Sequence, residues 1–392
     1  MIRPIRFGAF CAAAALLLSA AIGFPGHADN GKVFDRAWSL VEKRYWDRTM
    51  HHLDWESVRD RYYPRAVAAP DTQHLYAVIN EMLALLGDSH VYATSPTRLA
   101  YERGKFDGDS AAGFGFDAVQ IQGQWVIQSI AHPGPAATAG IQIGWKLISI
   151  DGQPIDIDRH FGAGDIATIV LEDEHGVRHT MALKGVTLPD EPDRRAVRSS
   201  DGILTLAFDQ FDKGDDRWVA RELAEQPAPA GVILDLRENG GGDADILDRI
   251  AGQFVGDRQV ILRLIAKRTI EEQTSGAGPR SYRGPLAILV GPRTASAAEV
   301  LTAFLDETGR AVTVGEKTAG AATGGVDHDL PDGGQLSIAE YDLQTANGTR
   351  LEGRGFAPRH QVIPTLAQLR RGEDPAWERA RALIAGGERA TR

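Results

Sequence analysis

Cysteine is almost absent from this chain of 392 residues. The single one, Cys11, lies close to the N-terminus. Beyond residue 28 there is therefore no disulfide, no thiol nucleophile and no thiolate metal ligand. The sequence also lacks an HExxH motif and any clustered His/Cys set of the kind that binds zinc. We therefore expect neither a metal nor a cofactor.

Basic residues are fewer than acidic ones. The chain has 43 lysines and arginines against 53 aspartates and glutamates, for a formal net charge of −10. Without a basic run, this balance argues against the nucleic-acid backbone as a partner. An apolar fraction of 43% and a charged fraction of 24% are ordinary for a globular protein. The length predicts two or three domains.

Only one long apolar run occurs, FGAFCAAAALLLSAAIGF at 7–24. It follows Arg3 and Arg6 and precedes GHA at 26–28, which places small residues at the −3 and −1 positions of a cleavage site. This pattern predicts a secretory signal peptide over residues 1–28 and an exported protein, periplasmic or secreted. An uncleaved membrane anchor is the alternative, although the run is short for a bilayer span.

Two segments after this run have the apolar spacing of helices. They are VFDRAWSLVEKRYW at 33–46 and DTQHLYAVINEMLALL at 71–86. Asp71 can cap the second helix and Gly87 can end it. We predict a small N-terminal helical domain over residues 29–95, with His90 just beyond its last helix.

From about residue 104 the pattern changes to short strands separated by glycine and proline. Residues 104–187 resemble a PDZ domain, through GFGF at 113–116 and GPAATAGIQIGWKLISIDGQPI at 134–155. The resemblance implies that a peptide's terminal carboxylate binds the first of these motifs, which comprises Gly113, Phe114, Gly115 and Phe116. The family's groove helix is represented only by IDIDRHFGAGD at 155–165, so we expect a reduced groove.

Residues 192–366 alternate strand and helix patterns, which is typical of an α/β fold with a largely parallel sheet. Residues 367–392 have the composition of a polar helical tail. Within the α/β region, GVILDLRENGGGDADI at 231–246 is a buried strand that ends in a glycine-rich turn and opens a helix. The turn could bind a phosphate, but no Gly-Lys-Ser/Thr follows, and a plain tight turn is the simpler alternative.

A second motif gives the glycine turn another meaning. The segment PLAILVGPRTASAAEVLTAFLDETGRAVTVGEKTAG at 285–320, taken with the turn, resembles the S41 peptidase family of C-terminal processing and tricorn-type proteases. That family has Leu-Arg-x-Asn-Pro-Gly-Gly and then Ser-Ala-Ser-Ala-Ser-Glu with the nucleophile in its middle. Here Gly240 replaces the proline, and Ser296 takes the place of the nucleophile.

The resemblance implies a crotonase-like α/β core, with an N-terminal helical domain and an inserted PDZ-like domain. It also implies a serine endopeptidase that acts on protein or peptide substrates, some of them through their C-termini. The backbone N–H of Ala297, with that of Gly241 or Gly242, would form the oxyanion hole. The alternative is a catalytically inactive binding protein on the same fold.

The general base distinguishes two branches of the family. One branch uses a lysine 25 residues after the serine, but position 321 of this chain is alanine, and Lys317 is four residues too early. An exposed lysine is protonated at neutral pH and cannot accept a proton. A Ser-Lys dyad is therefore not expected.

The tricorn-type branch fits better. Its base is a histidine that follows a serine in the N-terminal helical region, and this chain has Ser89 and His90. Glu352, in RLEGRGFAPRH at 350–360, matches the family's glutamate. Imidazole is an effective base near neutral pH. We expect Ser296 as nucleophile and His90 as base, with Ser89 and Glu352 orienting the imidazole.

Four charged residues close in sequence to these motifs are expected to have structural roles. Asp88 is interpreted as a cap or turn residue, and Glu299 as a favourable charge on a helix dipole. Asp235 and Arg237 are predicted to hold the glycine turn through a charge-assisted pair.

Overall fold

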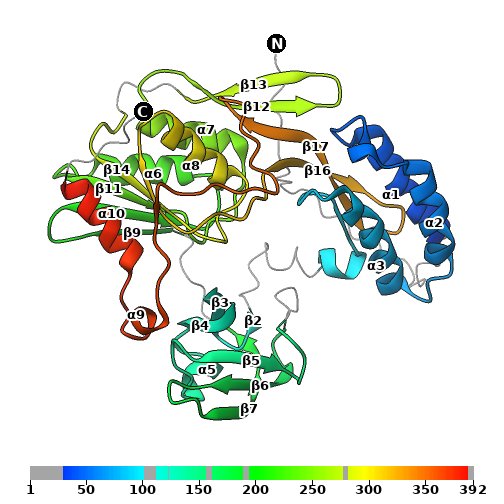
Figure 1. Cartoon of the computed structure of the whole chain (residues 1–392), viewed down its shortest axis with the longest axis horizontal. Helices are drawn as coiled ribbons and strands as arrows, with labels where there is room; N and C mark the ends of the chain where they lie inside the picture. The colour runs from blue at the N-terminus through cyan, green and yellow to red at the C-terminus, as the bar shows by residue number, and fades with distance from the viewer. Residues whose placement is uncertain are drawn as a thin grey trace, which may run out of the picture. The chain divides into compact units, whose positions relative to one another are not determined.

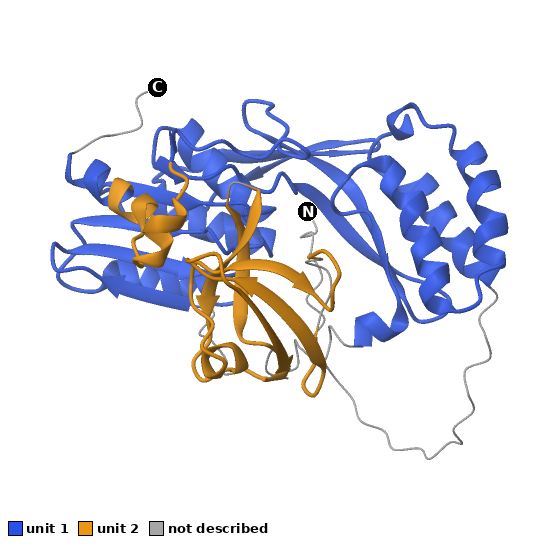
Figure 2. Cartoon of the chain, turned by 60° about the horizontal axis from the view of Figure 1, so that its bottom comes forward, with its two compact units in different colours: residues 1–101, 193–361, 380–392 blue, residues 102–192, 362–379 orange. Residues whose placement is uncertain are grey.

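The structure is a computed structural model. It describes residues 30–100, 112–121, 123–155, 161–188, 194–276 and 281–386. The predicted signal peptide therefore lies outside the described residues. The chain forms two compact units, coloured separately in Figure 2: residues 1–101, 193–361 and 380–392 in unit 1, and residues 102–192 and 362–379 in unit 2. No helix of the described residues is both long and apolar enough to cross a membrane.

Unit 1 contains a six-stranded sheet in the order β18-β15-β14-β11-β10-β9, parallel except for the edge strand β9. Its strands are β9 (Arg194–Arg198), β10 (Ile203–Phe208), β11 (Gly231–Asp235), β14 (Leu286–Val290), β15 (Val312–Gly315) and β18 (His360–Gln361). All residues of β11 and β14 are buried, as expected for the interior of a parallel sheet. The helices that accompany the sheet are α6 (Asp215–Ala224), α7 (Ala244–Phe254) and α8 (Ala297–Glu307).

A second, antiparallel sheet belongs to the same unit. It consists of β1 (Tyr92–Thr94), β12 (Val260–Ala266), β13 (Ile270–Thr274), β16 (Thr323–Asp329) and β17 (Gln335–Thr345). The sequence pattern of residues 192–366 predicted strands in a largely parallel sheet, and the strand at 260–266 does not follow that prediction. That strand, β12, pairs with β17 across a long sequence separation instead of joining the parallel sheet. Periodicity indicates a strand and carries no information about its partner.

The N-terminal helices pack on this second sheet (Figure 1). They are α1 (Asn30–Arg44), α2 (Trp55–Val67) and α3 (Thr72–Leu83), the last of which continues as the short helix η2 (Ala84–Leu86). Their apolar side chains share one core with Leu336, Ile338 and Ala339 of β17. The predicted helical domain therefore belongs to the same compact unit as the α/β core.

Local signals placed the ends of α3 correctly. Asp71 accepts a hydrogen bond from the His74 N–H at 2.9 Å, and Gly87 ends the helical region at φ 69°. Helix α2 was not predicted, because its apolar residues have weak helical periodicity and Pro64 interrupts its sequence pattern.

Unit 2 is built on a five-stranded antiparallel sheet, β3-β4-β5-β6-β7. Its elements are β2 (Ala112–Gly113), β3 (Phe116–Ile121), β4 (Gln124–Ile130), α5 (Pro135–Thr138), β5 (Lys146–Ile150), β6 (Ile166–Glu172), β7 (Arg178–Lys184) and β8 (Val186–Thr187). The predicted groove segment at 155–165 lies partly outside the described residues.

The predicted C-terminal tail is divided between the two units. Helix α9 (Leu366–Arg370) belongs to unit 2, where the Arg370 guanidinium donates to the Gly144 carbonyl at 3.1 and 3.3 Å. Helix α10 (Pro375–Ala385) follows, and its last residues belong to unit 1. Gly372, at φ 67°, separates the two helices, so the tail is not one continuous helix.

Candidate active site

Ser296 stands at the N-terminus of α8, directly after the loop that follows β14. Its backbone has φ 51° and ψ −120°, a conformation that residues other than glycine rarely adopt. The Ser296 N–H donates to the Ala321 carbonyl at 2.9 Å and to Glu299 Oε2 at 3.2 Å. A strained backbone that several hydrogen bonds hold in place is common at functional sites.

Glu299 holds the loop opposite Ser296. Its side chain is fully buried and accepts hydrogen bonds from the Thr318 hydroxyl, from the Gly320 N–H at 2.8 Å and from the Ala321 N–H at 2.9 Å. Burial raises the pKa of the Glu299 carboxyl, and the hydrogen bonds oppose that rise. Glu299 therefore does more than complement the helix dipole: it fixes the loop against Ser296.

Ser89, His90 and Glu352 form one hydrogen-bonded set. Glu352 is buried, and it accepts from the Ser89 N–H at 2.7 Å and from the Ser89 hydroxyl at 3.0 Å. The same hydroxyl lies 2.9 Å from His90 Nδ1. Because a carboxylate oxygen accepts, the Ser89 hydroxyl donates its hydrogen bond to Glu352 and accepts a hydrogen bond from His90 Nδ1–H. His90 Nε2 is then the unprotonated ring nitrogen.

Three consecutive residues, Ala321 to Thr323, connect this set to Ser296. The Ala321 carbonyl accepts from Ser296, the Ala322 N–H donates to Glu352 Oε2 at 2.6 Å, and Thr323 Oγ1 lies 3.1 Å from His90 Nδ1. Among the described residues, no direct hydrogen bond joins Ser296 to His90. Sequence reasoning missed Thr323, because nothing in its neighbours marks it.

The surroundings of His90 favour the neutral imidazole. Burial lowers the pKa of His90, and the negative charges of Glu352, Asp88 and Asp327 oppose this effect. Gly325 leaves room for the ring, since a Cβ at that position would lie 3.2 Å from His90 Cβ and 3.3 Å from Cδ2.

The glycine turn approaches Ser296 closely. A Cβ on Gly241, which has φ +105°, would lie 2.6 Å from Ser296 Cβ and 3.1 Å from the Ala297 nitrogen. The Gly241 N–H donates to Asn239 Oδ1 at 2.9 Å, so it is already satisfied within the turn. Within the described part of the chain, the N–H groups of Gly242 and Ala297 donate to no protein acceptor.

Other residues singled out in the sequence lie as follows. Gly240 donates its N–H to the Asp209 carbonyl at 3.0 Å, a bond that the family's proline cannot make. Lys317 is exposed. Arg237 donates to both carboxylate oxygens of Asp235, at 2.8 and 2.6 Å, which confirms the predicted pair. His360 lies on β18.

The GFGF residues lie in unit 2. Gly113 pairs with Val186, and Phe114 is a core residue whose ring centroid lies 4.7 Å from that of Phe161. Gly115 adopts φ +76°, and a Cβ there would approach Pro135 to 3.4 Å. Phe116 begins β3, the edge strand of its sheet.

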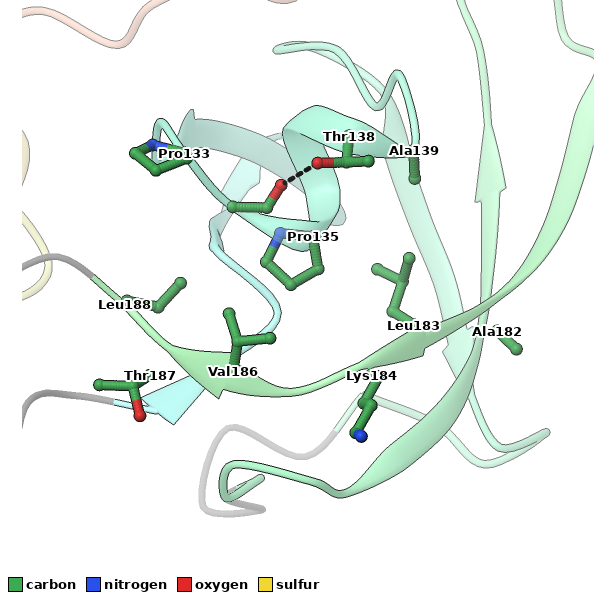
Figure 3. Close-up of a pocket in the computed structure, with 11 residues that line it drawn as sticks. Pro133, Pro135, Thr138, Ala139, Ala182, Leu183, Lys184, Val186, Thr187 and Leu188 are labelled. Atoms are coloured by element: carbon green, nitrogen blue, oxygen red, sulfur yellow. Dashed lines mark hydrogen bonds between the residues drawn. The ribbon is translucent and has the colours of Figure 1, made fainter.

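A groove of about 720 Å³ lies beside this loop (Figure 3). Leu183, Val186 and Leu188 face Pro135 across it, whereas the Lys184 side chain points away from Pro135. The groove is therefore mainly apolar. No group of three or more His, Cys, Asp or Glu residues arranged to hold a metal ion occurs among the described residues.

Two family models match the chain. The model for peptidase family S41 matches residues 202–362, and the model for the tricorn protease C1 domain matches residues 27–84. These regions contain Ser296 and Glu352, and the helices that precede Ser89 and His90.

Known relatives cover most of the chain. A carboxyl-terminal-processing protease from Picosynechococcus sp. is 26% identical over 355 residues, which are 86% of this chain and 84% of the relative. Tricorn protease homolog 1 from Streptomyces coelicolor is 25% identical, covering 91% of this chain and 35% of the relative.

Solved structures share the fold. The photosystem II D1 C-terminal processing protease has a TM-score of 0.64 at 23% identity, with 89% of this chain and 99% of that one covered. The tricorn protease has a TM-score of 0.56 at 18% identity, with 91% and 37% covered. These likenesses establish a mixed α/β fold with an N-terminal helical region.

Proposed function

Because the chain belongs to peptidase family S41 and is a serine-type hydrolase, we propose that it is an exported endopeptidase with Ser296 as nucleophile and His90 as general base. Its substrates are proteins or peptides. The observation that carries this proposal is the hydrogen-bonded series from Glu352 through Ser89 to His90 Nδ1, which leaves Nε2 free to accept a proton.

The chemistry follows from this arrangement. Ser296 Oγ forms a bond to the scissile carbonyl carbon, and its proton passes to His90 Nε2. Glu352 and Ser89 stabilise the imidazolium that results. The imidazolium then protonates the leaving amine as the C–N bond breaks, which leaves an acyl-enzyme. In the second half of the reaction, water gives a proton to His90 and attacks the acyl carbon. The ester bond to Ser296 Oγ then breaks as the imidazolium returns the proton to Oγ.

The developing oxyanion needs N–H donors that no protein group already occupies. We assign the oxyanion hole to the N–H groups of Ala297 and Gly242, because Gly241 donates to Asn239. Each such donor contributes about 3–4 kcal/mol to transition-state stabilisation. Gly241 serves instead by letting the turn approach Ser296.

A fluorophosphonate probe tests the proposal directly. The probe should label folded wild-type protein at Ser296, because phosphonylation requires an activated serine hydroxyl. Labelling is measured by mass spectrometry of the tryptic peptide, with Ser296→Ala as the unlabelled control. A folded protein that takes up no probe would favour the alternative of an inactive binding protein.

We propose further that unit 2 is a PDZ-like domain that selects substrates, through the GFGF loop at 113–116. Removing residues 104–187 should reduce cleavage of protein substrates more than hydrolysis of a small ester, because the groups that perform the chemistry lie in unit 1. The two rates are compared on the same preparation, after circular dichroism shows that it is folded. Equal loss on both substrates would instead make residues 104–187 part of the catalytic scaffold.

A further inference from the structure

Asp88, two residues before His90, accepts hydrogen bonds from side chains that have no part in the proposed mechanism. Its side chain is 2% exposed and accepts from Trp46 Nε1 at 2.8 Å, from the Tyr45 hydroxyl and from Arg350 Nη2 at 2.9 Å. His51 Nε2 lies 3.9 Å away. Burial and the bond to Asp88 raise the pKa of Tyr45, so its hydroxyl remains a donor. The buried Asp88 carboxylate therefore links three side chains, and Asp88 is not a simple cap or turn residue as the sequence suggested.

Arg350 is held equally firmly on the other side. Its Nε donates to Asp342 Oδ1 at 2.6 Å, and Asp342 also accepts from Gln344 Nε2 at 3.1 Å. The guanidinium carbon lies 5.3 Å from the centroid of the Trp46 ring, within cation–π range. With both carboxylates and this ring around it, the guanidinium has one well-defined position.

Asp88 and Arg350 lie close in sequence to the proposed catalytic residues. Arg350 precedes Glu352 by two residues, as Asp88 precedes His90 by two. The segments 88–90 and 350–352 are thus joined twice, by the ion pair at one end and by the two hydrogen bonds from Ser89 to Glu352 at the other. A displacement of either segment would therefore change the position of His90 relative to Glu352.

We propose that Asp88 and Arg350 are positioning residues that hold the His90 imidazole in register with Glu352 and Ser296. This inference rests on the proposed function, since it assigns the ion pair a part in the same reaction. A displacement of about 1 Å in a catalytic group can reduce the rate on the order of 100-fold.

The two partners should affect His90 in opposite directions. Asp88→Asn removes a negative charge near the imidazole, which destabilises the imidazolium and lowers the pKa of His90. Arg350→Met removes the cation that neutralises Asp88, so the field at His90 becomes more negative and its pKa rises. Glu352 and Asp327, the other carboxylates that act on His90, stay unchanged in both variants. A purely structural role, in which neither charge acts on the imidazole, would leave the pKa of His90 unchanged in both folded variants.

The test measures both catalysis and the imidazole itself. In Asp88→Asn and in Arg350→Met, kcat should fall about 10- to 100-fold with little change in KM, and Arg350→Lys should recover part of the loss. The pKa of His90 is read by NMR of its ring proton in the inactive Ser296→Ala background. This readout is independent of turnover and separates His90 from the nearby His51.

Asp215→Asn is the matched control. Arg194–Asp215 is also an ion pair with a buried carboxylate, 3% exposed, and it joins β9 to α6 without contacting the catalytic residues. This variant should lose stability but leave the titration of His90 unchanged. The inference is overturned if folded Asp88→Asn keeps the wild-type kcat, or if the two variants shift His90 in the same direction. Activity that survives Ser296→Ala would overturn the proposed function instead.

Discussion

Ser296→Ala and His90→Ala should each abolish peptide hydrolysis, with kcat lower by about 10⁴- to 10⁶-fold. The nucleophile and the base act as one unit, so the double variant should be hardly worse than either single one. Initial rates on an internally quenched peptide, at a pH above the midpoint of His90 titration, measure the effect. Glu352→Gln should cost less, because a neutral amide can still accept from Ser89.

Lys317→Ala is the control for this prediction. Lys317 is exposed and lies off the position that the lysine-dependent branch uses, so its loss should leave most of the activity. If Lys317→Ala were inactive while His90→Ala kept its rate, the base would be the lysine.

Gly241→Ala should reduce kcat about 100- to 1,000-fold while the protein remains folded. The added Cβ would lie 2.6 Å from Ser296 Cβ and 3.1 Å from the Ala297 nitrogen, so the turn must withdraw from the nucleophile. Gly242 follows directly and would move with it, opening the oxyanion hole. Steady-state kinetics and thermal unfolding, measured together, separate this loss from a loss of folded protein.

Backbone strain alone does not account for the predicted loss of activity. The variant Gly333→Ala measures the effect of the strain by itself. Gly333 has φ +91°, close to the +105° of Gly241, but a Cβ there would meet nothing within 4 Å. Both variants should therefore carry a strain cost of about 1–3 kcal/mol, whereas only Gly241→Ala should lose activity. Equal kinetic effects of the two substitutions would refute the steric argument.

The elements that depend on local chemistry were predictable from the sequence. Asp71 and Gly87 mark the ends of a helix whose apolar stripe is plain, and the strands around the glycine turn are continuous apolar runs. The pair Asp235–Arg237 also follows from the sequence, since the two residues stand on one strand and turn. The family resemblance rested on two motifs, and residue identity and spacing are what such motifs preserve.

Tertiary structure decided what depends on contacts between distant segments. Residue type could not show that Asp88 meets Arg350, because the two are 262 positions apart and either could have been solvated. The position of β12 in the second sheet and the contact of Thr323 with His90 depend in the same way on long-range pairing. Sequence thus determined the chemical groups, whereas the fold determined which of them are hydrogen-bonded to one another, because burial and pairing depend on the arrangement of the whole chain.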